Sequence, residues 1–193
     1  MKEIILIFII LISSIHQIKA QSIQIDDIKN STLLIKLTTN EHLINYHINN
    51  GAFQKAESIR INQKVENQKI ISAFQQSWSS CKVYFFYSHH TEQIKNKQLD
   101  YLFKDINEAR LNDVEKEEVE NHQKKLQLII GYFGQTSGTL KFNALVLMNH
   151  EFKQFPKPMP KYVRTYNGLW FLKRTPKKVV EILEKKMIWN YSK

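Results

Sequence analysis

The residues with the clearest potential for catalysis follow a strongly apolar segment, residues 81–87. His89, His90 and Glu92 come directly after it, and the carboxyl ends of strands in open α/β sheets often carry ligand sites. Imidazole and carboxylate groups together can bind a metal ion or transfer protons. Adjacent residues on an extended chain point to opposite sides, so His89 and His90 need a turn to bind one ion. A polar surface loop is the simpler interpretation of the same residues.

A second polar pair, His150 and Glu151, follows another apolar segment, residues 140–148. If the two apolar segments are neighbouring strands, His90, Glu92, His150 and Glu151 could form one site. The enzyme hypothesis is a small exported hydrolase that uses the region of His89, His90 and Glu92, and a metal ion shared with His150 is one version of it. This interpretation depends entirely on the strand order.

Cys81 is the single cysteine of the chain, so the domain has no intramolecular disulfide. It could be a nucleophile with His89 or His90 as its base. A thiol at the start of an apolar strand is more often a small buried hydrophobe. The chain contains none of the motifs HExxH, GxSxG, GxxxxGK[ST] and GxGxxG. We therefore assign no catalytic residue, no metal ligand and no cofactor.

The positive charge of the chain is concentrated near its carboxyl end. The formal net charge is +10, and residues 153–193 contain eleven basic residues but only Glu181 and Glu184 as acids. An acidic segment, residues 113–120, forms the opposite pole. Such separation can attract anionic partners, although a solvated basic face that maintains solubility is the simpler interpretation.

Five basic residues of this region lie among four aromatic residues. The aromatic residues are Tyr162, Tyr166, Trp170 and Phe171, and the candidate anion-binding residues are Arg164, Lys173, Arg174, Lys177 and Lys178. Cations beside aromatic rings can bind sugars, lipid head groups or single-stranded nucleic acid. The predicted partner is a protein, a glycan or an anionic envelope component. Alternatively, the rings belong to the core and the cations extend outward from them.

The first twenty residues have the layout of a secretory signal peptide. Lys2 precedes an apolar run from Ile4 to Ile12, and Ala20 stands in the position before a cleavage site. The run is too short for a typical membrane span, so an uncleaved anchor is the weaker alternative. We expect export to the periplasm or the extracellular space, with no transmembrane helix after cleavage. Export also makes nucleic acid an unexpected partner.

The remaining residues, 21–193, are expected to form one globular domain, because no Pro/Gly/Ser-rich linker divides them. Apolar patterning predicts the following strands and helices. The strands are residues 31–38, 81–87, 126–133, 140–148 and 162–166, and the helices are residues 41–49, 52–78, 112–125 and 176–190.

Several details of these elements can be tested. Asn40 is expected to cap the first helix, and the second helix is expected to break near Ile61. Residues 32–37 and 82–87 should pair in parallel through a helical crossover. The last helix should begin at Pro176 with Thr175 as its cap. Its apolar stripe is predicted to comprise Val179, Val180, Leu183, Met187 and Ile188.

Four segments together carry a resemblance: LLIKL, CKVYFFYS, KFNALVLMNHEF and the YVRTY that follows a proline-rich stretch. This combination resembles small exported proteins of unknown function from Bacteroidetes-type bacteria, and it implies no site residue. The predicted fold is an α/β domain with a mixed sheet of four to five strands. The predicted function is non-enzymatic binding through the basic carboxyl-terminal region. A small exported hydrolase and an envelope-assembly subunit are the alternatives.

Overall fold

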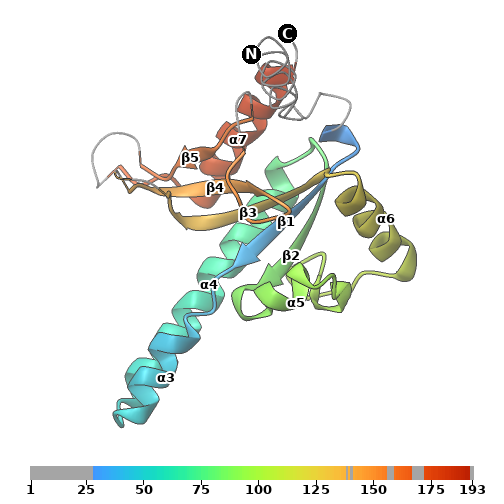
Figure 1. Cartoon of the computed structure of the whole chain (residues 1–193). Coiled ribbons are helices and arrows are strands. Elements are labelled where there is room, and N and C mark those ends of the chain that lie inside the picture. The colour runs from blue at the N-terminus through green and yellow to red at the C-terminus, as the bar shows by residue number, and fades with distance from the viewer. Residues whose placement is uncertain (1–27, 138, 140, 156–158, 167–171, 192–193) are drawn as a thin grey trace, which may run out of the picture.

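The structure is a computed structural model. It describes residues 28–191 except 138, 140, 156–158 and 167–171 (Figure 1). The predicted signal peptide and part of the proline-rich stretch therefore lie outside the described residues. No helix within the described residues is both long enough and apolar enough to cross a membrane.

The domain is built on one mixed sheet of five strands in the order β2-β1-β3-β4-β5. β1, β2 and β3 are mutually parallel, and β4 and β5 continue the sheet in antiparallel fashion. The strands are β1 (Thr32–Leu37), β2 (Lys82–Tyr87), β3 (Leu128–Gln135), β4 (Asn143–Asn149) and β5 (Tyr162–Arg164). The predicted α/β fold with a mixed sheet is confirmed.

The crossover from β1 to β2 consists of α3 (Glu41–Asn49) and α4 (Phe53–Ser77). β1 and β2 pair in parallel with the predicted register, from Thr32 opposite Lys82 to Leu37 opposite Tyr87. α4 is continuous, so the expected break near Ile61 is wrong. Residues 53–77 contain neither proline nor glycine, and nothing in their sequence interrupts the backbone hydrogen bonds of the helix.

Asn40 does not cap α3 in the expected way. Its backbone is left-handed, with φ 54°, and its side chain makes no capping hydrogen bond. Instead, the Asn40 side-chain amide donates a hydrogen bond to Gln63 of α4. Asn40 therefore joins the two helices of the crossover.

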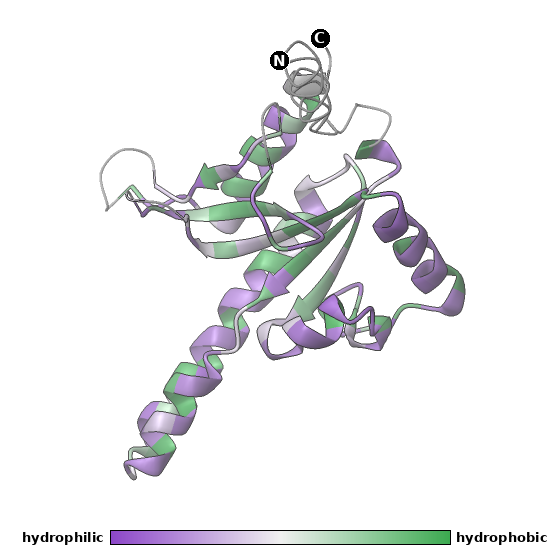
Figure 2. Cartoon of the chain, in the orientation of Figure 1, coloured by the Kyte–Doolittle hydropathy of each residue, from purple (hydrophilic) through white to green (hydrophobic). Residues whose placement is uncertain are grey.

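One face of the sheet is covered by α4 and by α7 (Pro176–Tyr191) (Figure 1). The first core lies between these two helices and the sheet, whose strands are largely apolar (Figure 2). α7 contributes Val179, Val180, Leu183 and Met187, each at most 1 % exposed. Ile188 is 56 % exposed, so its inclusion in the buried stripe is wrong. Successive helical residues are 100° apart, and Ile188 therefore points away from the side occupied by Leu183 and Met187.

The other face is covered by shorter elements, which are α5 (Thr91–Lys95), a 3-10 turn (Leu99–Tyr101) and α6 (Asp113–Lys124). α6 begins with a capping box, in which Asn112 and Glu115 each accept a hydrogen bond from the other's backbone N–H. Only Val119 of α6 is buried. The predicted helix at residues 112–125 is therefore confirmed, and Val119 belongs to the second core.

The chain closes with a hairpin, a short edge strand and α7. β3 and β4 pair in antiparallel fashion, as their glycine-containing connection predicts. α7 begins at Pro176, and the backbone N–H of Lys178 donates to Thr175 Oγ1 at 3.2 Å, so the predicted cap is confirmed. Glu184 of α7 accepts hydrogen bonds from the hydroxyls of Ser79 and Ser80 just beyond α4. α7 is thus tied to the carboxyl-terminal end of α4.

Candidate functional site

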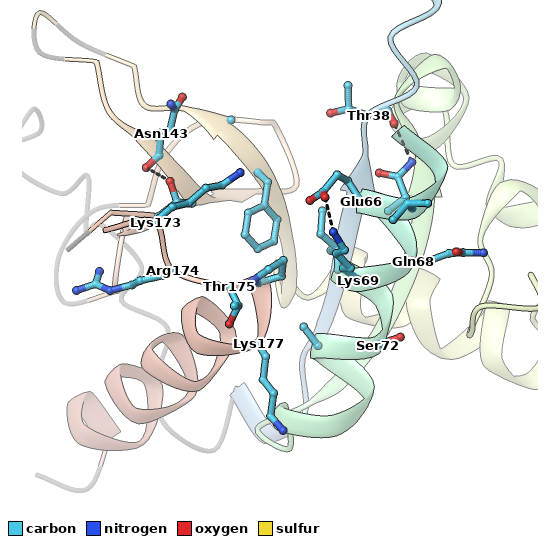
Figure 3. A pocket seen from close by; sticks show the side chains of 18 of the residues that line it. Thr38, Glu66, Gln68, Lys69, Ser72, Asn143, Lys173, Arg174, Thr175 and Lys177 are labelled. Atoms are coloured by element: carbon cyan, nitrogen blue, oxygen red, sulfur yellow. Dashed lines mark hydrogen bonds and ion pairs between the residues drawn. The ribbon is translucent and has the colours of Figure 1, made fainter. Parts of the chain in front are cut away.

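A cleft of about 880 Å³ lies between α4 and residues 173–177 at the start of α7 (Figure 3). We call it the basic cleft. α4 and α7 pack side by side on the sheet, and the cleft lies at the amino-terminal end of α7. The ends of β3 and β4 border it through Phe133, Gly134, Asn143 and Ala144. The cleft therefore combines residues from both halves of the sequence.

One wall of the basic cleft is the start of α7 and the residues before it. An isolated bridge pairs Tyr166 with Lys173, and the backbone N–H of Arg174 donates to Thr165 O at 2.7 Å. These contacts fix residues 173–175 against the edge of β5. In Figure 3, Lys173 extends toward α4 whereas Arg174 turns away from it. Arg174 Nη1 donates to Arg164 O at 2.9 Å, which explains its direction.

The opposite wall is α4. Glu66 and Lys69 lie on the side of α4 that faces the cleft and form an ion pair at 2.7 Å (Figure 3). Buried Asn67 donates to Thr38 O at 2.8 Å and so attaches the helix to the end of β1. Each wall of the cleft is therefore attached to the sheet by a hydrogen bond, one through Asn67 and the other through Arg174.

The lining residues carry a clear excess of positive charge. Among the described residues, the lining cations are Lys36, Lys69, Lys173, Arg174 and Lys177, and the one lining acid is Glu66. Among the described residues, no carboxylate lies within ion-pair distance of Lys173 or Lys177. Two cations at the mouth are therefore available to an anion.

Lys36 borders the basic cleft but does not direct its charge into it. Leu33, Ile35 and Leu37 of β1 belong to the core under α4, so strand alternation turns Lys36 to the other face. There its ammonium lies 4.8 Å from the centre of the Tyr132 ring. Burial, and then the charge of Lys95, lower the pKa of Lys36. We therefore leave it out of the proposed anion contacts.

The structure brings together three of the five predicted anion-binding residues. Lys173, Arg174 and Lys177 line the basic cleft. Arg164 does not line it, and its guanidinium lies 4.0 Å from the centre of the Phe142 ring. Lys178 pairs with Glu181 at 3.1 Å. Sequence reasoning missed Lys69, which lies about a hundred residues earlier and has no basic cluster around it.

The predicted polar site after β2 contains a turn, which two adjacent histidines need if their rings are to lie on the same side of the chain. Ser88–His90 form a 3-10 turn, and the ring centres of His89 and His90 are 4.0 Å apart. His89 Nδ1 lies 2.9 Å from Glu41 Oε1 at the start of α3. Burial, and then the neighbouring His89, lower the pKa of His90. Glu92 pairs instead with Lys95 at 2.8 Å.

His150 and Glu151 lie at the opposite end of the sheet from His90. β2 and β4 are not neighbours, because β1 and β3 lie between them. β4 also runs antiparallel to β3, so its carboxyl end at Asn149 pairs with Ile129 near the amino end of β3. The joint site of His90, Glu92, His150 and Glu151 is therefore wrong. Among the described residues, no three His, Cys, Asp or Glu side chains are grouped closely enough to hold a metal ion.

Cys81 is placed as a structural residue. Burial is the main cause that raises the pKa of its thiol to about 12, so the reactive thiolate is scarce near neutral pH. Its carbonyl oxygen accepts a hydrogen bond from Trp78 Nε1 at 3.0 Å. These features favour the interpretation as a small hydrophobe over that as a nucleophile.

The chain matches no family model, no curated protein and no solved structure. The resemblance to small exported proteins of Bacteroidetes-type bacteria therefore stays a prediction.

Proposed function

We propose that this protein is an exported binding protein that takes an anionic ligand or partner into the basic cleft. The observation that carries the proposal is the position of Lys173 and Lys177 at a cleft whose one lining acid, Glu66, is already paired with Lys69. An anion placed there would meet two ammonium groups that have no carboxylate within ion-pair distance among the described residues. Charge-assisted hydrogen bonds to such groups are stronger than neutral ones.

The residues that line the basic cleft support ligand binding more than catalysis. Thr38 and Asn143 bring a hydroxyl and an amide to the border of the cleft, and Lys177 lies in the first turn of α7, near the positive end of the helix dipole. These groups can hold an anion by hydrogen bonds and charge. The described residues that line the cleft include no histidine and no cysteine, which are common bases and nucleophiles of hydrolases.

The test is retention on immobilised heparin, used as a polyanionic probe. We expect the double variant Lys173→Gln/Lys177→Gln to bind heparin less tightly, by about tenfold per lysine, because each substitution removes a charged hydrogen bond. Arg164→Gln/Lys178→Gln is the matched control, because it removes the same charge from residues outside the cleft. Equal shifts for the two double variants would show that net charge, and not the cleft, retains the protein.

Export is tested separately by cell fractionation of the tagged full chain. We expect the chain in the exported fraction, and a variant without residues 1–20 in the cytosol. Retention of both forms in the cytosol would remove export from the proposal and leave the cleft unaffected.

A further inference from the structure

A second cavity, of about 360 Å³, lies where the carboxyl ends of β1 and β2 meet. The connection that leaves β1 packs on one face of the sheet as α4, and the one that leaves β2 packs on the other face as α5 and α6. The two connections therefore diverge at the cavity. In open α/β sheets, ligands bind in crevices outside the carboxyl ends of the strands. We call this cavity the strand-end crevice.

The two charged walls of the strand-end crevice have opposite signs. Arg60 and Lys64 line it from α4, and residues four apart in a helix lie on the same side. Glu41 lines it from the start of α3, and Glu108 lines it from the loop before α6. Cations and carboxylates therefore face one small volume.

The charges of these walls are held apart. Glu41 contacts His89 at 2.9 Å, and Glu108 accepts a hydrogen bond from the Tyr87 hydroxyl at 2.6 Å. Arg60 pairs with Glu57 of its own helix. Among the described residues, no ion pair joins Arg60 or Lys64 to Glu41 or Glu108. A molecule that carries both charges could therefore bridge the crevice.

Between the charged walls, the crevice presents apolar surface. Ile44 of α3 and Ile71 of α4 are buried, and both line it. The Tyr87 ring and Ile106 complete this surface, and Ile106 is 44 % exposed. An apolar side chain placed on these residues would leave water.

We propose that the strand-end crevice binds a zwitterion with an apolar body, of the class of the hydrophobic α-amino acids. The ligand carboxylate lies toward Lys64 and Arg60, and its ammonium group lies toward Glu41 and Glu108. Its side chain packs on Ile44, Ile71 and Tyr87. This site is separate from the basic cleft, and neither proposal depends on the other.

The experiment is isothermal titration of the purified protein with L-leucine and L-phenylalanine. We expect saturable binding of both, and binding at least tenfold weaker for glycine, N-acetyl-leucine and leucinamide. Each of these three lacks one element of recognition: the apolar side chain, the ammonium charge or the carboxylate. No measurable binding of L-leucine and L-phenylalanine at millimolar concentration would overturn the proposal, as would equal binding of N-acetyl-leucine and leucinamide.

Variants locate the site. Lys64→Gln and Glu41→Gln should each weaken the binding of L-leucine about 10- to 100-fold, because each removes a charged hydrogen bond. Lys55→Gln is the matched control, because Lys55 is exposed on the same helix and does not line the crevice. Thermal unfolding of each variant checks that the fold is retained. L-leucine binding that is unchanged in both crevice variants would place the ligand elsewhere and refute the assignment.

Discussion

The two halves of α4 have the same helical conformation but very different surroundings. The carboxyl-terminal half lies on the sheet, where Ile70, Ile71, Ala73 and Phe74 are buried. The amino-terminal half extends beyond the sheet with α3 as its neighbour (Figure 1), and Phe53 is 65 % exposed there. The proposed ligand sites both border α4 near the junction of these halves. The core thus holds one half of α4, and we call the amino-terminal half, which extends beyond the sheet, the free half.

The largest expected effect is at the centre of the buried half. Phe74 is fully buried, and its ring makes edge-on contacts with Trp78 and Phe85. We expect Phe74→Ala to lower the free energy of unfolding by about 3–5 kcal/mol, through lost burial and a cavity. Denaturant unfolding measures this. A loss below 1 kcal/mol would show that the two halves of α4 differ less than their burial indicates.

A second large effect is expected where α7 covers the same core. Leu183 is fully buried, and Lys185 is exposed on the same helix. Leu183→Ala should cost about 2–5 kcal/mol, whereas Lys185→Gln should change the unfolding free energy by less than about 0.5 kcal/mol. Equilibrium unfolding of both variants without lipid tests this pair. If Leu183→Ala unfolds like the wild type, α7 does not close the core.

The stability of the fold should also depend on pH through His122 of α6. His122 Nδ1 lies 2.8 Å from Thr32 Oγ1 at the start of β1, and burial lowers the pKa of His122. The unfolded chain, with a histidine pKa of about 6.5, therefore takes up a proton more readily than the folded chain. Stability should be fully present above pH 6.5 and fall as the pH drops below it.

The comparison that isolates this effect is His122→Gln. Its unfolding free energy should decline less steeply than that of the wild type between pH 7 and pH 5. His90, whose pKa is also lowered, should keep part of the decline in this variant. Parallel curves for the two proteins would remove His122 from the explanation.

The smallest effect is expected at the free half of α4. Phe53→Ala should change the unfolding free energy by less than about 0.5 kcal/mol, because the ring of Phe53 is largely in water. Hydrogen exchange should show faster amide opening at residues 53–60 than at residues 70–77. A loss comparable to that of Phe74→Ala would show that the free half packs against something in solution.

Most of the elements could be predicted because they depend on local patterns. The apolar runs around Ile35 and Phe85 are β1 and β2, and the crossover between them made parallel pairing the expected arrangement. Two expectations about individual helix residues are wrong. α4 passes through Ile61 without a break, and Ile188 points to solvent.

The candidate sites were less predictable, because their residues come from distant parts of the chain. Lys173 and Lys177 stood out within a basic segment, but Lys69 had no such signal. His89 stood out after an apolar strand, but Glu41 precedes it by nearly fifty residues. Spacing alone could not show which of these groups face one another.

The amino-acid sequence by itself determined the kinds of element, the α/β class and the segregation of charge near the carboxyl end. These follow from side-chain periodicity, turn residues and composition, which act over a few residues. Only the tertiary structure decided that β1 and β3 separate β2 from β4. It also decided that β4 runs antiparallel to β3, which places His90 and His150 at opposite ends of the sheet. It also decided that α4 and the start of α7 enclose one basic cleft. Strand order and helix packing are set by burial of apolar faces between distant segments, and no local pattern encodes that balance.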